Sequence, residues 1–216
     1  PDETERVNTL ITHIQAYLYQ KKEWSPYQEG AFAPSLCNRI DRNTGGIVIA
    51  AKTAEGLRVM NQKIRDRELK KYYLCIVHGT LPRPAGRLEG YILKDEAKKQ
   101  VTVSSRPRPG AKTAVTLYET LAVRNGLSLV RCQLITGRTH QIRAQFAAAG
   151  HPLLGDGKYG SERQNKRYGR SYQALYSYRL EFCFTTDAGA LAPLDGQQFQ
   201  VEQVDFVTEY FPGFSL

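Results

Sequence analysis

The stretch Cys37-Asn-Arg-Ile-Asp-Arg-Asn-Thr-Gly-Gly46 places one carboxylate between two arginines and closes on two glycines. The cations Arg39 and Arg42 favour the ionised form of Asp41. The glycines carry no Cβ atom, so the backbone can take positive φ and let a ligand approach closely. Aspartates in turns more often cap backbone amides than take part in catalysis. On its own, the stretch leaves Asp41 open to either a structural or a catalytic role.

A second dense polar cluster, Thr136-Gly-Arg-Thr-His-Gln-Ile-Arg143, lies where a predicted strand gives way to a predicted helix. Arg138 stands at this junction, where backbone amides already favour anions. Its planar guanidinium can hold a carboxylate or a phosphate through two parallel hydrogen bonds. Taken alone, Gln141 and Arg143 are expected to be exposed helix residues, and His140 is expected to have a structural role.

The rest of the chain predicts a strand-rich α+β domain. Apolar residues at three- or four-residue steps indicate helices at residues 3–20, from Thr53 to about residue 64, and from about residue 139 to Gly150. Aromatic and β-branched runs indicate strands near residues 47–51, 72–78, 86–93, 99–104, 112–123, 127–135, 174–184 and 197–206. Asn125-Gly126 is a strong hairpin signal between two of them. Closely spaced strands of this kind favour a single domain with a mixed, mostly antiparallel sheet.

Composition and charge point to a polyanionic partner. The 216 residues carry a formal net charge of +9, with a pI near 9.4, which favours nucleic acid or an acidic membrane surface. No apolar run is long enough to span a bilayer. The cysteines form no CxxC pair, so neither a zinc site nor a disulfide framework is expected. Free thiols suit a reducing, cytoplasmic location.

Three motifs in order resemble the RluA-type pseudouridine synthases. They are NRIDRNTGG, then KYYLCIVHG, then TGRTHQIR running into GHPLLGDGKYG. The resemblance covers roughly residues 36–184. It implies an α+β fold, in which a mixed, mostly antiparallel sheet with flanking helices surrounds a central RNA-binding cleft. It also implies conversion of specific uridines in structured RNA, ribosomal or transfer, to pseudouridine.

The resemblance assigns roles to individual residues. Asp41 matches the catalytic carboxylate, Tyr73 the tyrosine that stacks on the flipped base, and Arg138 the arginine that pairs with the carboxylate. Arg39 matches the arginine that takes the place of the flipped nucleotide. The residues expected to bind substrate RNA are Arg39, Arg42, Thr44, Gly45, His140, Gln141 and Arg143.

The implied chemistry needs no cofactor and no metal. Isomerisation breaks the C1′–N1 bond of uridine, turns the base and forms a C1′–C5 bond, with no net redox change. The nucleotide must leave its stack, and a base–aromatic contact of about 1–3 kcal/mol can receive it. RNA is the expected partner. No obligate protein partner is indicated, and a monomer is expected.

The chain departs from the family pattern in a few places. Asn38 stands where the family usually has His, Gly45 where Ser is common, and Tyr176 where many relatives carry His. Residues 1–216 are expected to form one catalytic domain that lacks the family's N-terminal strand and loop, and any separate N-terminal RNA-binding domain.

Two other functions fit parts of the sequence. An RNA-binding module of the same fold could lack activity, although the joint presence of Asp41, Tyr73 and Arg138 argues against this. A hydrolase of glycosidic bonds would need a second, separately tuned carboxylate. Asp156, in the loop that follows Gly150, is the one candidate, and we interpret it as a loop-ordering residue.

Overall fold

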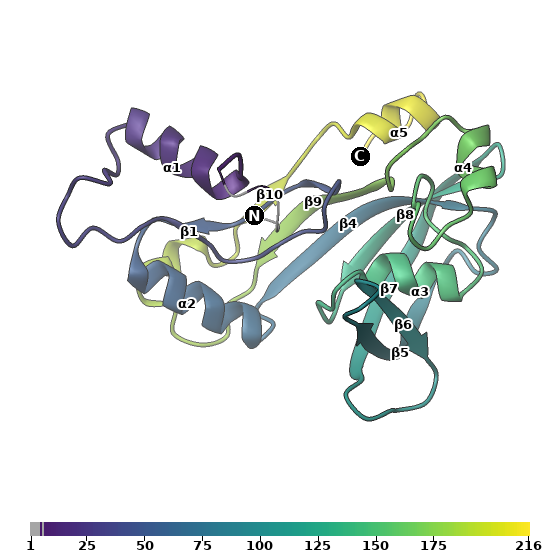
Figure 1. Cartoon of the computed structure of the whole chain (residues 1–216), viewed down its shortest axis with the longest axis horizontal. Coiled ribbons are helices and arrows are strands. Elements are labelled where there is room, and N and C mark those ends of the chain that lie inside the picture. The colour runs from purple at the N-terminus through teal and green to yellow at the C-terminus, as the bar shows by residue number, and fades with distance from the viewer. Residues whose placement is uncertain (1–4, 6) are drawn as a thin grey trace. The chain divides into compact units, whose positions relative to one another are not determined.

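The computed structural model describes residue 5 and residues 7–216, which fall into two compact units (Figure 1). The first unit comprises residues 1–39, 48–69 and 182–197. The second comprises residues 40–47, 70–181 and 198–216. Both units are therefore built from segments that lie far apart in the sequence. In the described residues, no helix has the length and apolar character needed to cross a membrane.

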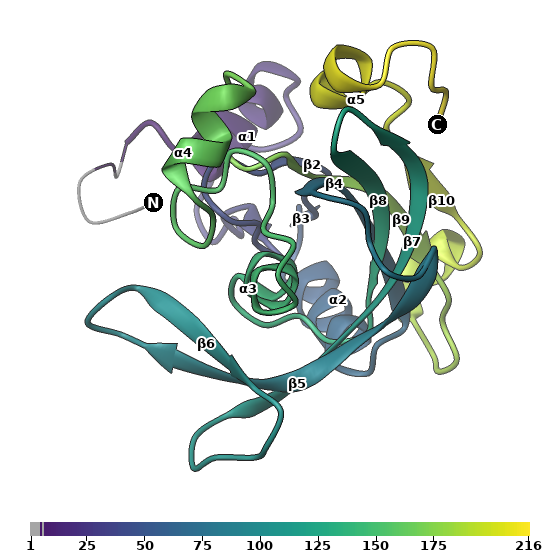
Figure 2. The ribbon, with the colours of Figure 1, turned by 90° about the vertical axis from the view of Figure 1, so that its right-hand side faces the viewer.

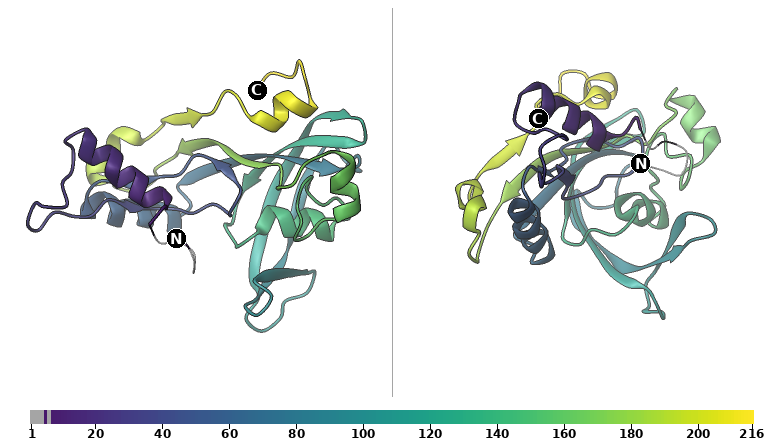
Figure 3. Two further views of the ribbon diagram at one scale, coloured as in Figure 1. Left: turned by 45° about the horizontal axis from the view of Figure 1, so that its top comes forward. Right: turned by 60° about the vertical axis from the view of Figure 1, so that its left-hand side comes forward.

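The first unit contains helix α1 (Leu10–Gln20) and the long loop that follows it (Figure 3). The predicted helix at residues 3–20 therefore begins late, and residues 1–4 and 6 lie outside the described residues. The start is set by Thr9 and Thr12, which form a reciprocal capping box. Of the apolar face that the sequence predicts, Leu18 is buried, whereas Val7 and Leu10 are exposed.

The remaining elements of the first unit pack around helix α2 (Ala54–Arg65). Thr53, where the sequence predicts the helix to begin, caps it: its side chain accepts a hydrogen bond from the Gly56 backbone amide at 3.0 Å. Helix α2 contacts β3 (Ala50–Ala51), which pairs antiparallel with β1 (Ser35–Leu36). It also contacts the 3-10 helix η1 (Gly189–Leu194).

An ion pair is buried within this first unit. Lys63 Nζ lies 2.7 Å from Glu68 Oε2, and both side chains are less than 5% exposed. The same ammonium donates to the carbonyl and hydroxyl oxygens of Thr186, while Thr185 donates to the other carboxylate oxygen of Glu68. The buried charges are therefore paired and hydrogen-bonded, as burial requires.

The second unit is dominated by an eight-stranded sheet formed by the described residues, in the order β10-β9-β4-β8-β7-β5-β6 with β2 paired to β9 (Figures 1 and 2). The β2–β9 pair is parallel, whereas β4–β8, β8–β7, β7–β5, β5–β6 and β9–β10 are antiparallel. The predicted mixed, mostly antiparallel sheet is thus confirmed. The strands are β2 (Gly45–Gly46), β4 (Leu69–His78), β5 (Ala85–Asp95), β6 (Gln100–Ser104), β7 (Lys112–Arg124), β8 (Leu127–Leu134), β9 (Leu175–Phe182) and β10 (Gln198–Gln200).

Strand β4 is buried on both faces, because each face supports its own core. Leu74 and Ile76 pack with residues of helix α5 (Asp205–Tyr210) and its flanks. Tyr73, Cys75 and Val77 alternate with them and pack with helix α3 (Gln141–Ala148). The period-two alternation of a strand thus places Tyr73 on the α3 face.

Helix α3 lies in the curve of the sheet, in contact with β5, β6 and β7 (Figure 2). Its side chains Ile142 and Phe146 are buried in the core between the helix and the sheet. The β7–β8 hairpin turns at Asn125 and Gly126, both with positive φ, as the sequence predicted.

The predicted strand at residues 197–206 is wrong beyond residue 200. Strand β10 ends at Gln200, and helix α5 begins at Asp205. Val204, Val207 and Phe211 are buried in one core, at the three- and four-residue spacing of a helix. The run Val201, Val204 and Phe206 obscures this spacing in the sequence. The predicted strand at residues 47–51 forms only at its end, as β3 (Ala50–Ala51), and residues 47–49 belong to no strand.

Candidate active site

The turn that carries Asp41 is fixed to strand β9 of the second unit. The backbone amide of Thr44 donates to the Asp41 carbonyl at 3.0 Å, which closes the turn. Buried Gln173 donates to the carbonyl of Arg42 and to the hydroxyl of Thr44. Beyond the turn, Gly45 pairs with Tyr176 in the parallel register of β2 and β9. These contacts hold the Asp41 backbone in place, while its side chain remains 22% exposed.

The two glycines of the turn make room for strand β9. A Cβ atom on Gly45 would lie 2.5 Å from Cε2 of Tyr176. A Cβ atom on Gly46, whose φ is +112°, would lie 2.1 Å from the carbonyl oxygen of Ser177. Close approach of a ligand at these glycines stays a prediction; the close neighbour at both positions in the structure is strand β9. Two departures from the family pattern, Gly45 and Tyr176, are in direct contact.

Tyr73 lies near Asp41, and only 8% of it is exposed. Burial raises the pKa of the Tyr73 phenol, a hydrogen bond with the Ser177 side chain opposes this shift, and the negative charge of Asp41 adds to it. The ring therefore stays neutral at physiological pH. Its hydroxyl is anchored on β9, the same strand that holds the Asp41 turn.

Arg143 supplies the cation that contacts Asp41. Its Nη1 donates to Asp41 Oδ2 at 3.2 Å, from the first turn of helix α3. The predicted pairing of Arg138 with Asp41 is wrong, because Arg138 Nε instead donates to the Thr113 carbonyl at 3.0 Å. The expectation that Arg143 and Gln141 are exposed is wrong as well, since both are buried.

The backbone conformation at His140 explains why Arg143, and not Arg138, contacts Asp41. His140 takes a left-handed conformation with φ of 51°, and helix α3 begins after it rather than near Thr139. This later start brings Arg143 into the first helical turn and leaves Arg138 in the preceding turn. Gln141 secures the junction, since its Oε1 accepts from the Arg138 amide at 3.0 Å and its Nε2 donates to the Val115 carbonyl.

A second carboxylate holds the same arginine. Asp156 Oδ2 accepts from Arg143 Nε at 2.7 Å, and Oδ1 accepts from Nη2 at 3.0 Å. Burial alone would raise the pKa of Asp156, but Arg143 and the backbone amides of Lys158 and Tyr159 hold it below its ordinary value. The predicted loop-ordering role is confirmed by those two amide bonds, and the contact with Arg143 was missed.

Aromatic and imidazole groups surround the arginine. Its guanidinium carbon lies 5.3 Å from the centroid of the Tyr159 ring. The Tyr159 hydroxyl is 2.8 Å from His140 Nδ1, and burial lowers the pKa of His140 despite the nearby charge of Asp41. His140 is therefore mainly neutral at pH 7. The sequence offered no signal for the Tyr159 contact beyond its place in the glycine-rich loop.

The structure does not test the other predicted RNA contacts. Thr44, Gln141 and His140 make hydrogen bonds within the protein, and Arg39 and Arg42 are exposed. Arg39 belongs to the first unit, whereas Asp41 belongs to the second. These residues, and the central cleft expected around them, stay predictions. Among the described residues, no group of His, Cys, Asp or Glu is arranged to hold a metal ion.

Residues 8–148 match the family model described as RNA pseudouridylate synthase. An uncharacterised RNA pseudouridine synthase of Mycoplasma pneumoniae is 33% identical over 96% of this chain and 61% of its own length. The ribosomal large subunit pseudouridine synthase D of Borreliella burgdorferi is 31% identical over 81% of this chain and 51% of its own length.

Solved structures support the fold. Human RNA pseudouridylate synthase domain containing 4 superposes with a TM-score of 0.68 at 22% identity, covering 92% of this chain and 80% of that one. Human RNA pseudouridylate synthase domain containing 1 gives 0.66 at 18% identity, covering 94% and 85%. The chain spans about half of the Borreliella relative and about three fifths of the Mycoplasma relative.

Proposed function

Because this chain belongs to the RNA pseudouridylate synthase family and is of the RluA type, we propose that it isomerises uridine in RNA to pseudouridine. One observation carries the proposal: a partly exposed carboxylate, Asp41, lies against a buried arginine and near a buried tyrosine. This arrangement provides a charged group for the sugar or base and an aromatic surface beside it.

In the proposed reaction, Asp41 supplies the carboxylate that promotes cleavage of the C1′–N1 bond. The detached base turns and forms the C1′–C5 bond, then loses its C5 proton while N1 regains one, so substrate and product are isomers. Arg143 donates to Asp41 from Nη1 and so orients the carboxylate. Tyr73 provides the stacking surface for the base that has left its helix.

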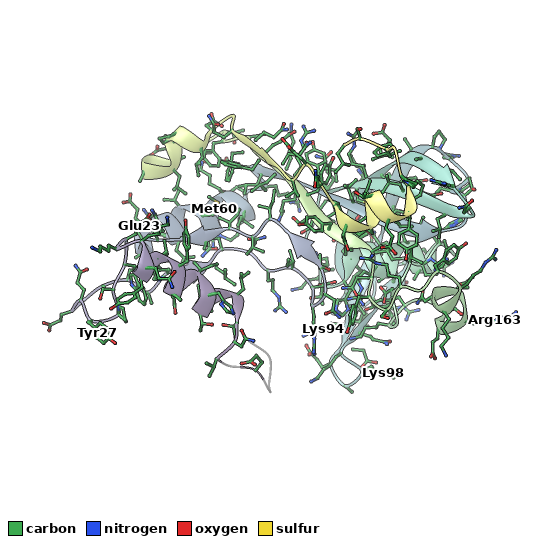
Figure 4. The ribbon with its side chains drawn as sticks, turned by 90° about the horizontal axis from the view of Figure 1, so that it is seen from above. Glu23, Tyr27, Met60, Lys94, Lys98 and Arg163 are labelled. Carbon is green, nitrogen blue, oxygen red and sulfur yellow. The ribbon has the colours of Figure 1, made fainter. Side chains whose placement is uncertain are left out.

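We propose structured RNA as the substrate, ribosomal or transfer. The net charge of +9 supports a polyanionic partner, and one relative is named as acting on the large ribosomal subunit. Exposed cations on the second unit are suited to phosphate contacts. Lys94 and Lys98 project from the β5–β6 hairpin, and Arg163 from helix α4 (Glu162–Arg167), as Figure 4 shows.

The test follows tritium released from C5 when RNA labelled with 5-³H-uridine is incubated with the protein. The wild type is expected to release tritium, and Asp41→Asn to release less than about a hundredth as much while RNA binding is retained. Asp195→Asn is the matched control, because Asp195 accepts a backbone amide in the first unit. Equal release by wild type and Asp41→Asn, or none from any cellular RNA, would contradict the proposal.

A further inference from the structure

We propose that Asp156 is a positioning residue, which fixes the guanidinium of Arg143 so that one of its nitrogens faces Asp41. The inference rests on the proposed function, because it concerns the orientation of the carboxylate that would act on uridine. No substrate contact is assigned to Asp156 itself. It acts through Arg143, because its buried carboxylate orients the guanidinium that contacts the more exposed carboxylate of Asp41.

The first observation is that the guanidinium nitrogens of Arg143 are shared between the two carboxylates. Asp156 takes the edge of the guanidinium formed by Nε and Nη2, at 2.7 and 3.0 Å. The remaining nitrogen, Nη1, donates to Asp41 Oδ2 at 3.2 Å. A planar guanidinium that is held by two parallel hydrogen bonds cannot rotate about its long axis. The direction of Nη1, and hence its contact with Asp41, is therefore set from the Asp156 side.

The second observation is the rigidity of Asp156 itself. Its side chain is fully buried, and Oδ1 also accepts the backbone amides of Lys158 and Tyr159 at 2.9 and 3.1 Å. The same loop presents the Tyr159 ring to Arg143. The arginine is thus held by a carboxylate and by an aromatic ring from one short segment.

The third observation separates the two carboxylates. Asp41 is 22% exposed, whereas Asp156 is 0% exposed. Burial lowers the pKa of Arg143, but the hydrogen bond and charge of Asp156, together with the charge of Asp41, raise it above its ordinary value. The guanidinium therefore stays charged, and Asp41 is the carboxylate that remains open to a substrate.

A purely loop-ordering role makes a different prediction from a positioning role. If Asp156 only orders its loop, its effect on the rate does not depend on Arg143. If it acts through Arg143, its effect disappears once Arg143 has been replaced. A double-mutant cycle separates these cases, because coupling appears only between residues that act together.

The experiment measures single-turnover tritium release from 5-³H-uridine RNA. The variants are Asp156→Asn, Arg143→Met and the double variant, with Asp195→Asn as the control for loss of a backbone-capping carboxylate. Asparagine retains an oxygen for the loop amides but presents an NH₂ group toward Arg143. We expect Asp156→Asn to slow the wild type by about 10²-fold and to slow the Arg143→Met variant by less than about 3-fold. Equal slowing in both backgrounds would overturn the proposal.

A crystal structure of Asp156→Asn provides a readout that needs neither turnover nor the Arg143 variant. We expect the distance from Arg143 Nη1 to Asp41 Oδ2 to lengthen beyond about 3.5 Å, the limit of a hydrogen bond. An unchanged distance would overturn the positioning role. If the wild type converts no uridine, the proposed function fails, and this structure still decides the positioning role.

Discussion

Arg143 pairs with two carboxylates, so we expect its replacement by methionine to lower the stability of the protein strongly. Arg143 is 7% and Asp156 is 0% exposed, so the substitution leaves a buried carboxylate without its cation. Removal of one partner from a buried pair costs about 3–5 kcal/mol. We expect Arg143→Met to lower the free energy of unfolding by that amount at pH 7, as measured by urea denaturation followed by circular dichroism.

The loss of stability in Arg143→Met is expected to depend on pH. Arg143 depresses the pKa of Asp156 in the folded protein. The stability that this provides is fully present above the unfolded pKa of about 3.9 and is lost as pH falls through the folded pKa. The difference in stability between wild type and Arg143→Met should therefore shrink in acid, where the carboxylate is protonated in both proteins.

Two comparisons sharpen the test. Adding Asp156→Asn to Arg143→Met removes the unpaired charge and should recover part of the lost stability. Arg131→Met breaks a more exposed pair with Glu119, and should cost less than about 1 kcal/mol. A loss in Arg143→Met no larger than that in Arg131→Met, or no recovery in the double variant, would refute the reasoning.

Three further predictions concern other parts of the chain. Gly45→Ala should lower the free energy of unfolding by about 1–3 kcal/mol, measured by urea denaturation, because the new Cβ clashes with Tyr176. Adding Tyr176→Ala should relieve that cost but should not relieve the cost of Gly46→Ala. Equal costs of Gly45→Ala with and without Tyr176 would contradict this. The pKa of Glu68 is lowered to about 2, first by its hydrogen bond with Lys63, so its stabilising effect should be present above pH 4.5 and be lost as pH falls toward 2. Glu68→Gln should then flatten acid unfolding in that range by circular dichroism, and an unchanged acid profile would count against the pair. Lys98→Ala should reduce the slope of log affinity against log salt for RNA by about 1, whereas Thr102→Ala on the same hairpin should leave it unchanged; equal slopes would exclude the hairpin from phosphate contact.

Local chemistry made most of the strands predictable. The aromatic and β-branched residues before His78 predict β4, and Asn125-Gly126 predicts the turn between β7 and β8. Thr53 likewise marks the start of α2. These signals act over a few residues, so a single sequence contains them.

The predictions failed where contacts between distant parts of the chain determine the local structure. Whether Arg138 or Arg143 reaches Asp41 depends on the left-handed conformation of His140 and on where helix α3 begins. Asp156 and Asp41 lie more than a hundred residues apart in the chain and meet through one arginine. No local pattern specifies such a meeting. Helix α5 could not be predicted for a similar reason, because its residues pack in the core on the face of β4 opposite to helix α3.

The most direct test of the central claim is the chemical identity of the product. RNA treated with the protein is digested to nucleosides, which are separated by liquid chromatography, and free bases are quantified in the same sample. The account predicts that wild type yields pseudouridine, an isomer of uridine with unchanged mass, without release of uracil, and that Asp41→Asn yields none. Release of free uracil would instead indicate hydrolysis of the glycosidic bond, and pseudouridine formation by Asp41→Asn would contradict the role of Asp41.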